Sequence, residues 1–228
     1  MAYRFALFDA DNTLLDFTYA ERMAIRACLR ARGLTDDEAT LSLYSTINDR
    51  HWKALERGET TRDRLKVERF AHLFTALQYD GDAASMAQDY ISALSQQGKL
   101  LDGALELVQS IHGKCELYII TNGITTVQKS RFARCGLAPY FKHCFISEEM
   151  GCAKPEKIFF DQVAEAIDGF DPSKALVIGD SLSSDMLGGI RAGLDTCWYS
   201  PKGAKAPADM SMTYQVSDLS EIIPILLD

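Results

Sequence analysis

Short apolar runs alternate with helical patterns at the start of the chain and through its second half. The runs are rich in β-branched and aromatic residues and cover residues 3–8, 115–120, 143–146, 175–179 and 195–200. Strands that are buried on both faces of a parallel sheet read as continuous apolar segments of this kind. Alternation of such strands with helices is typical of βαβ units. The pattern therefore predicts an α/β fold built on a Rossmann-like parallel sheet.

Helices are expected between these strands, because the intervening segments carry apolar residues at helical spacing. They cover residues 103–113, 125–136, 156–167 and 184–193. The final segment, residues 213–228, is expected to add a last strand and a closing helix that serve only to pack.

Residues 17–98 follow a purely helical pattern. The stretch has no proline, and its glycines lie where helices are expected to end: Gly33, Gly58, Gly81 and Gly98. Four helices are expected, over residues 19–33, from a capping box at 35–38 onward, from about residue 60 to about residue 78, and over 82–98. We therefore expect an α/β core of residues 1–16 and 99–228, with residues 17–98 inserted after the first strand as a helical domain.

The composition is that of an ordinary globular protein, with 228 residues of which 47% are hydrophobic. No apolar run approaches the ~18 residues of a membrane span, and residues 1–8 are too short for a signal peptide. The six cysteines form no CxxC pair, which favours reduced thiols over disulfides or a zinc site. A net charge of −8 disfavours nucleic acid as a partner. We expect a soluble, cytoplasmic protein, monomeric or a small homo-oligomer, that does not bind membranes.

Polar side chains stand where the expected strands end, and a lysine stands where a helix can start. They are Asp9 and Asp11, Thr121 and Asn122, Lys154 before Pro155, and Asp180 with Asp185. Each one alone would be read as a helix cap, a turn residue or a solvated side chain. In a parallel sheet, however, the carboxyl ends of the strands meet at one rim, where ligands bind. Three carboxylates at one rim repel each other unless a cation lies among them, and hard oxygen ligands suit Mg²⁺ with a phosphate and waters.

The two first aspartates have a spacing that suits catalysis. Residues i and i+2 of an extended chain point the same way, so Asp9 and Asp11 can both face a bound group. One can attack while the other moves a proton. Thr121 and the amides around Asn122 can donate to phosphoryl oxygens, and Lys154 can neutralise charge that grows in the transition state.

Four motifs in this order resemble those of the haloacid dehalogenase (HAD) superfamily: DADNTL from residue 9, TN at 121, KP at 154 and GDSLSSD from residue 179. The resemblance covers the whole chain and implies a HAD-like core, with residues 17–98 as its inserted α-helical cap. It implies that Asp9 is the nucleophile that forms an aspartyl-phosphate, and that Asp11 protonates the leaving alkoxide and later activates water. It also implies that Mg²⁺ is bound by the Asp11 backbone carbonyl and by the carboxylates of Asp9 and Asp180.

The resemblance implies roles for the remaining residues at the rim. Thr121 holds the phosphoryl group, with Asn122 as a further phosphate-binding residue, while Lys154 steadies Asp9 and the phosphate. Asp185 supports the metal site from behind.

Position 12 is Asn where many members of the superfamily have Gly. This departure is shared by the bacterial pyrimidine 5′-nucleotidases, which the segments FDADNTLLDF and TNG also resemble. The resemblance implies a Mg²⁺-dependent phosphomonoesterase for nucleoside monophosphates, pyrimidine ones first. The alternatives are a phosphatase for another small phosphate, such as a sugar phosphate or phosphoglycolate, and a phosphomutase, which uses both aspartates too.

Two other classes fit the residues less well. A hydrolytic dehalogenase needs neither Mg²⁺ nor an acid at the second position of the aspartate pair, so Asp11 and Asp180 disfavour it. A receiver-like signalling module shares acidic strand ends, but an insert such as residues 17–98 has no role in it.

The insert itself holds few residues whose role can be inferred. Residues 51–69 mix six basic with four acidic side chains, which is typical of a solvated helical face with i,i+4 pairs. The alternative is that the loop at residues 56–62 contacts the substrate. Four aromatic residues are expected in the core: Phe17, Tyr19, Tyr44 and Trp52. The histidines show no metal-ligand spacing and are expected to be structural: His51, His72, His112 and His143.

Overall fold

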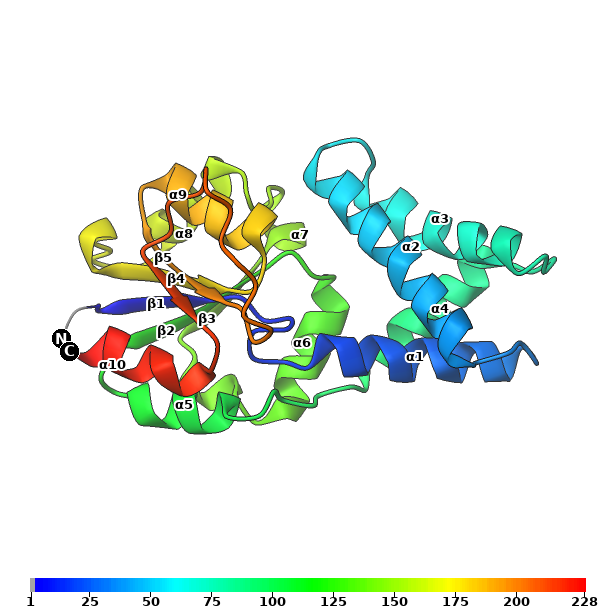
Figure 1. Ribbon diagram of the computed structural model, residues 1–228, viewed down its shortest axis with the longest axis horizontal. Coiled ribbons are helices and arrows are strands. Elements are labelled where there is room, and N and C mark those ends of the chain that lie inside the picture. The colour runs from blue at the N-terminus through cyan, green and yellow to red at the C-terminus, as the bar shows by residue number, and fades with distance from the viewer. Residues whose placement is uncertain (1–2) are drawn as a thin grey trace. The chain divides into compact units, whose positions relative to one another are not determined.

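The computed structural model describes residues 3–228, and the chain divides into two compact units (Figure 1). The first unit comprises the chain up to Asp16 together with Lys99–Asp228, and the second is Phe17–Gly98. The function of the second unit as a cap over a substrate stays a prediction.

The first unit is built on a single parallel sheet. Its strands are β1 (Phe5–Phe8), β2 (Glu116–Thr121), β3 (His143–Ile146), β4 (Ala175–Gly179), β5 (Asp195–Tyr199) and β6 (Tyr214–Val216). They are ordered β3-β2-β1-β4-β5-β6, and each neighbouring pair is parallel. The α/β fold with a Rossmann-like parallel sheet is therefore confirmed.

Helices cover both faces of this sheet. They are α5 (Ala104–Ile111), α6 (Thr125–Cys135), α7 (Ser147–Met150), α8 (Lys157–Ala166), α9 (Leu187–Ala192) and α10 (Ile222–Leu227). Figure 1 shows α5 and α10 on one face and α8 and α9 on the other. Alternate residues of β1 enter the two cores: Ala6 and Phe8 pack with α5 and α10, and Phe5 and Leu7 with α8. All four are completely buried, which explains why the strand is an unbroken apolar run.

The strand order reverses between β1 and β4. From β1 the chain moves to β2 and β3 on one side, and from β4 it moves to β5 and β6 on the other. In open parallel sheets the crevice beyond the carboxyl ends of such a pair is where ligands bind. Asp9 and Asp180 directly follow these two strands, so the fold places both carboxylates at the switch point.

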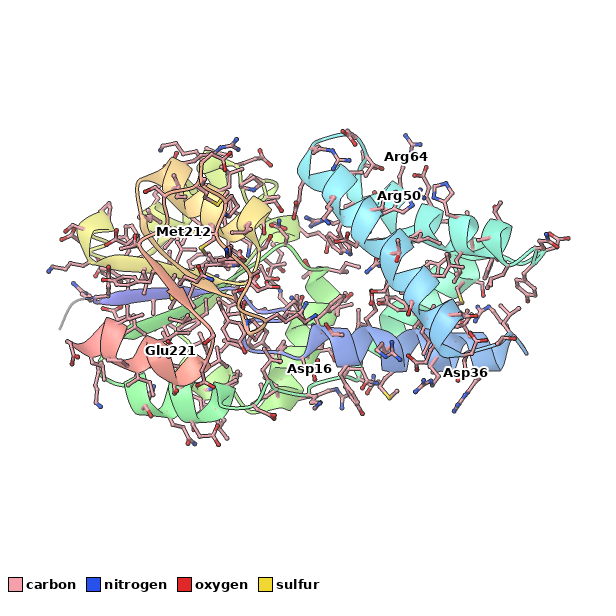
Figure 2. All side chains as sticks on the ribbon, viewed as in Figure 1. Asp16, Asp36, Arg50, Arg64, Met212 and Glu221 are labelled. Atoms are coloured by element: carbon pink, nitrogen blue, oxygen red, sulfur yellow. The ribbon has the colours of Figure 1, made fainter. Side chains whose placement is uncertain are left out.

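The second unit consists of α1 (Phe17–Ala31), α2 (Glu38–Glu56), α3 (Arg62–Ala76) and α4 (Ala83–Ser95). These are the helices that the sequence pattern predicts. The start of α2 differs, because Asp37 rather than Thr35 is the N-cap, and its carboxylate accepts from the Thr40 N–H at 2.8 Å. Asp36, labelled in Figure 2, is instead paired with Arg30 at 2.8 Å. Asp37 is thus the aspartate left to satisfy an open N–H of the first turn, which moves the helix start two residues onward.

Aromatic rings and the buried guanidinium of Arg69 fill the middle of the helical unit. Tyr44 stacks on Phe70, and Tyr90 packs against both rings at centroid distances of 5.3 to 5.4 Å. The guanidinium of Arg69 lies over the Phe70 and Tyr90 rings. The expectation that Tyr44 is a core residue is therefore confirmed, and it is wrong for Tyr19, whose side chain is 40% exposed.

Charged residues of α2 and α3 form ion pairs four positions apart, as expected for a face of mixed charge. Lys53 pairs with Asp49, and Arg64, labelled in Figure 2, is exposed and pairs with Glu68. The rings of His51 and His72 contact each other, with 2.8 Å between Nε2 and Nδ1.

The chain leaves and re-enters the first unit through two segments that lie side by side. The Asp16 N–H donates to the Lys99 carbonyl at 3.0 Å, and the Leu101 N–H donates to the Leu14 carbonyl at 2.9 Å. The Asp16 carboxylate, labelled in Figure 2, also pairs with the Lys99 ammonium at 2.8 Å. These contacts hold together the two segments of the first unit between which the insert begins and ends.

All six cysteines lie within the described residues and are free thiols, as the sequence predicts. Over residues 3–228, none of the helices is both long enough and apolar enough to cross a bilayer.

Candidate active site

Three carboxylates gather at the switch point of the sheet. Oxygen atoms of Asp9, Asp180 and Asp185 all lie within 4.8 Å of one another. Asp9 is held by its own N–H, which donates to the Ile178 carbonyl of β4 at 2.8 Å. The Asp180 carbonyl accepts from the Trp198 indole of β5 at 2.9 Å. Neighbouring strands thus fix the backbone on which the acidic side chains stand.

Lys154 is the cation of this cluster. Its buried ammonium donates to Asp9 Oδ1 at 2.7 Å, to Asp185 Oδ1 at 2.6 Å and to the Ile120 carbonyl at 2.8 Å. An ammonium has three donors, so all of them are used. Lys154 is therefore an immobile positive charge directly beside Asp9.

Burial is the main cause of the raised pKa values of Asp9 and Asp180 in this cluster. Burial raises the pKa of Asp9 to about 7, with Lys154 opposing the shift and Asp185 and Asp11 adding to it. Burial, then the charges of Asp9 and Asp185, raise the pKa of Asp180 well above its usual range. Burial alone would lower the pKa of Lys154, but Asp185 and Asp9 raise it above its ordinary value. Carboxylates whose charged forms are disfavoured by burial and by one another form an environment that a divalent cation fits.

Asp185 is positioned by the turn after β4. Its second oxygen accepts from the Ser181 N–H at 3.1 Å, at the start of the π-helical turn Leu182–Met186. Gly179, the last residue of β4, makes room for this carboxylate, because a Cβ there would lie 2.2 Å from Asp185 Oδ2. Since both oxygens of Asp185 are already bound by protein donors, the residue is suited to support the cluster.

The side chain of Asn122 forms two hydrogen bonds with the backbone of Lys154. Its amide donates to the Lys154 carbonyl at 2.8 Å and accepts from the Lys154 N–H at 3.0 Å. Both polar atoms of the Asn122 side chain are therefore hydrogen-bonded within the protein. The backbone N–H of Asn122 is the remaining group that can donate to a phosphate. Thr121 ends β2 beside it and is 1% exposed.

Asp11 lies next to the cluster but contacts a different part of the protein. Its two oxygens are bound by side chains of α6: Oδ1 by Arg131, and Oδ2 by the Gln128 amide at 2.8 Å. The same amide nitrogen of Gln128 donates to Thr121 Oγ1 at 2.8 Å. Gln128 and Arg131 were not identified from the sequence. A signal was present, because both lie at helical spacing among Val127 and Phe132 and so occupy the buried face of α6.

Asn12, the next residue, has a φ of 58°. Such a left-handed backbone is usual for Gly and is accessible to Asn at little cost. Its N–H donates to the Leu15 carbonyl at 2.8 Å, which closes the turn that follows the two aspartates. The replacement of Gly by Asn at this position therefore leaves the turn intact.

The fold and this acidic switch point define a hydrolase of one family. The model of the haloacid dehalogenase-like hydrolases matches residues 3–193, and the chain belongs to that family. The resemblance drawn from the motifs is confirmed.

Named relatives and a solved structure match this chain over nearly its full length. Pyrimidine 5′-nucleotidase PynA of Streptococcus pneumoniae is 40% identical over 99% of this chain and 96% of its own. Pyrimidine 5′-nucleotidase YjjG of Escherichia coli is 33% identical over 99% of both chains. A solved structure of the HAD-hydrolase YfnB of Bacillus subtilis bound to magnesium is 38% identical and superposes with a TM-score of 0.94, covering 99% of both chains.

Proposed function

We propose that this protein is a Mg²⁺-dependent phosphomonoesterase that acts through an aspartyl-phosphate on Asp9. The observation that carries the proposal is the buried cluster in which Lys154 binds Asp9 Oδ1 at 2.7 Å while Asp180 lies across the switch point. Lys154 holds the Asp9 carboxylate in one orientation and offers positive charge to a phosphoryl group that reaches it.

In the first step, a carboxylate oxygen of Asp9 attacks phosphorus and the bond from phosphorus to the leaving oxygen breaks. Asp11, in its protonated form, gives its proton to that oxygen, so the alcohol leaves neutral. In the second step, Asp11 takes a proton from water as the water attacks the phosphorus of the aspartyl-phosphate. Inorganic phosphate is released, and Asp9 and Asp11 return to their starting states.

The metal would be held by the carboxylates of Asp9 and Asp180 and by the backbone carbonyl of Asp11, with Asp185 behind them. When bound, Mg²⁺ supplies charge stabilisation to the phosphoryl oxygens and keeps nucleophile and phosphate together. The donor set fits, since these are hard oxygen ligands whose pKa values are raised first by burial and then by the neighbouring carboxylates, with Lys154 opposing the shift.

For the substrate, we propose nucleoside 5′-monophosphates, with pyrimidine nucleotides first. The support is that two relatives named pyrimidine 5′-nucleotidases are 40% and 33% identical over nearly the full length. The phosphoryl site is generic, so discrimination must come from the helical unit, which we propose as a cap over the leaving group. Tyr44 is not available to stack on a base, because it is fully buried among Phe70 and Tyr90, whereas Tyr19 is exposed.

A panel of phosphate esters tests this proposal. We expect kcat/KM for UMP, dUMP and dTMP to exceed that for AMP, and all of these to exceed glucose 6-phosphate and phosphoglycolate under one Mg²⁺ condition. If a sugar phosphate or phosphoglycolate leads by tenfold, about 1.4 kcal/mol of transition-state preference, the nucleotidase proposal is wrong and the phosphatase proposal stands. Conversion of a phosphate ester into an isomer without release of phosphate would indicate a mutase.

Removal of the metal should abolish turnover, because the carboxylates of the cluster then repel both one another and the phosphate. We expect EDTA to stop phosphate release and added Mg²⁺ to restore it. Ca²⁺ should bind without supporting much turnover, since its larger and looser shell misplaces nucleophile and phosphorus.

A binding measurement separates this effect from catalysis. Mg²⁺ and Ca²⁺ should each raise the thermal midpoint of the wild-type protein by mass action, and neither should raise that of Asp180→Asn to the same extent. Full activity in EDTA would overturn the metal assignment.

A further inference from the structure

A chain of hydrogen bonds on α6 connects the phosphoryl end of the site to the acid/base end. Gln128 Nε2 donates to Thr121 Oγ1 and to Asp11 Oδ2, at 2.8 Å in both cases. Arg131 donates to Asp11 Oδ1 and, at 3.3 Å, to Gln128 Oε1. Gln128 and Arg131 are one helical turn apart on the buried face of α6, and both are completely buried.

The hydrogen bonds of Thr121 determine where its hydroxyl proton can go. A hydroxyl has one donor and two acceptor lone pairs. Thr121 Oγ1 accepts from the Gly123 N–H at 3.1 Å and from Gln128 Nε2 at 2.8 Å, so both lone pairs are in use. The proton is therefore the part of the hydroxyl left to donate, and a phosphoryl oxygen is the acceptor that the site offers.

The backbone makes room for this arrangement at Gly123. A Cβ on Gly123 would lie 2.6 to 2.7 Å from Nε2, Cδ and Cγ of Gln128, closer than carbon atoms pack. The side chain of Gln128 thus lies directly against the backbone of the Thr121–Gly123 turn. Its position between Thr121 and Asp11 depends on the absence of a side chain there.

Arg131 constrains Asp11 more strongly than a surface ion pair would. Its side chain is 0% exposed, while that of Asp11 is 26% exposed. A buried guanidinium is costly unless it is paired and hydrogen-bonded, so the pair favours one orientation of the Asp11 carboxylate. With Oδ1 bound by Arg131 and Oδ2 by Gln128, the carboxylate cannot rotate without breaking a charged contact.

We infer that Gln128 and Arg131 are positioning residues for the phosphatase reaction: Gln128 orients the Thr121 hydroxyl toward the phosphoryl group, and Arg131 with Gln128 holds the Asp11 carboxylate toward the leaving oxygen. The inference rests on the proposed function, because it assigns the roles of Thr121 and Asp11 to phosphoryl transfer. Neither residue touches the reacting atoms. Both act through a residue that does.

Arg131→Met tests the hold on Asp11. Because kcat/KM reports the steps up to departure of the leaving group, we expect it to fall about 10- to 100-fold for UMP, the range of one charge-assisted hydrogen bond. For p-nitrophenyl phosphate, whose leaving group needs little protonation, it should fall less than about threefold. In an Asp11→Asn background, Arg131→Met should change kcat/KM for UMP by less than about twofold, since residues that act as a unit are not additive. Arg134→Met, which removes an exposed arginine one turn further along α6, is the matched control and should change neither substrate.

Gln128→Met tests the hydrogen bond from Gln128 to the Thr121 hydroxyl. Methionine has nearly the same length but does not donate, so the Thr121 hydroxyl loses one of its two donors and is free to turn. We expect the inhibition constant of inorganic phosphate to rise about tenfold, the range of one neutral hydrogen bond. Arg131→Met should leave that constant within about twofold, because Arg131 does not contact Thr121 in this chain of bonds.

A purely structural role predicts a different pattern. Loss of a buried arginine would then lower the thermal midpoint and reduce activity equally for UMP and p-nitrophenyl phosphate, and the loss would add to that of Asp11→Asn. This pattern would overturn the inference. Arg131→Lys keeps the charge, and it serves in place of Arg131→Met if the latter does not fold. It should retain the difference between the two substrates in weaker form.

The outcomes separate the inference from the function on which it rests. If Asp9→Asn and Asp11→Asn abolish or reduce turnover while the Gln128 and Arg131 variants behave like Arg134→Met, the inference is wrong and the phosphatase proposal stands. If the wild-type protein releases no phosphate from any ester with Mg²⁺ present, both are wrong.

Discussion

Replacement of Asp9 by asparagine should abolish turnover and leave the fold intact. The carboxylate of Asp9 is the proposed nucleophile and a proposed metal ligand, and an amide serves poorly as either. We expect kcat for UMP to fall by at least about 10³-fold. In the absence of metal the thermal midpoint should not fall, because burial disfavours a charge on Asp9 and, although Lys154 opposes the shift, raises its pKa to about 7.

The measurement is phosphate release by purified Asp9→Asn at saturating Mg²⁺, with the thermal midpoints of the variant and the wild type compared in EDTA. Asp161→Asn is the matched control, since Asp161 is an exposed aspartate of α8 whose carboxylate pairs with the surface residue Lys157 at 2.5 Å. Retention of a tenth of wild-type activity, with contamination excluded, would show that Asp9 is not the nucleophile.

Asp11→Asn should have the second largest effect, because Asp11 is proposed to move a proton in both steps. Loss of one positioned acid or base typically costs ~10²- to 10⁴-fold. We expect kcat for UMP to fall within this range. For kcat/KM, which reports only the first step, the loss should be much smaller with p-nitrophenyl phosphate than with a nucleoside monophosphate.

Comparison of the two substrates therefore decides the role of Asp11. Equal losses in kcat/KM would contradict the acid role, whatever their size. A burst of p-nitrophenol in Asp11→Asn, followed by slow turnover, would show that the aspartyl-phosphate forms and that its hydrolysis lacks a base.

Much of the fold was predictable because its strands are buried on both faces. Strands β3 and β4 coincide with apolar runs of the sequence, and three other runs overlap β1, β2 and β5 with ends that differ by one or two residues. Buried strands require apolar side chains at successive positions, so the local pattern carries the information. The same holds for the four helices of Phe17–Gly98, where proline is absent and glycines mark the ends.

The position of the candidate site was also accessible from the sequence. The carboxyl ends of parallel strands lie at the same end of the sheet. Polar residues that follow β1, β2 and β4 must therefore lie close together. The structure brings Lys154 into contact with Asp9 and Asp185, and it places Asp180 beside them. The catalytic and metal-binding roles of these residues stay predictions until the variants above are measured.

The sequence by itself thus determined the parallel sheet, the helical insert and the rim at which the acidic residues meet, because each follows from local periodicity and from the direction of strands. Only the tertiary structure decided which side chains hold Asp11 and Thr121. Gln128 and Arg131 are ordinary polar residues in a helical pattern, and they become part of the site because α6 turns their face toward Asp11 and Thr121. Tyr44 likewise lies in the core through rings supplied by two other helices. Contacts between residues far apart in the chain depend on packing, which no local pattern records.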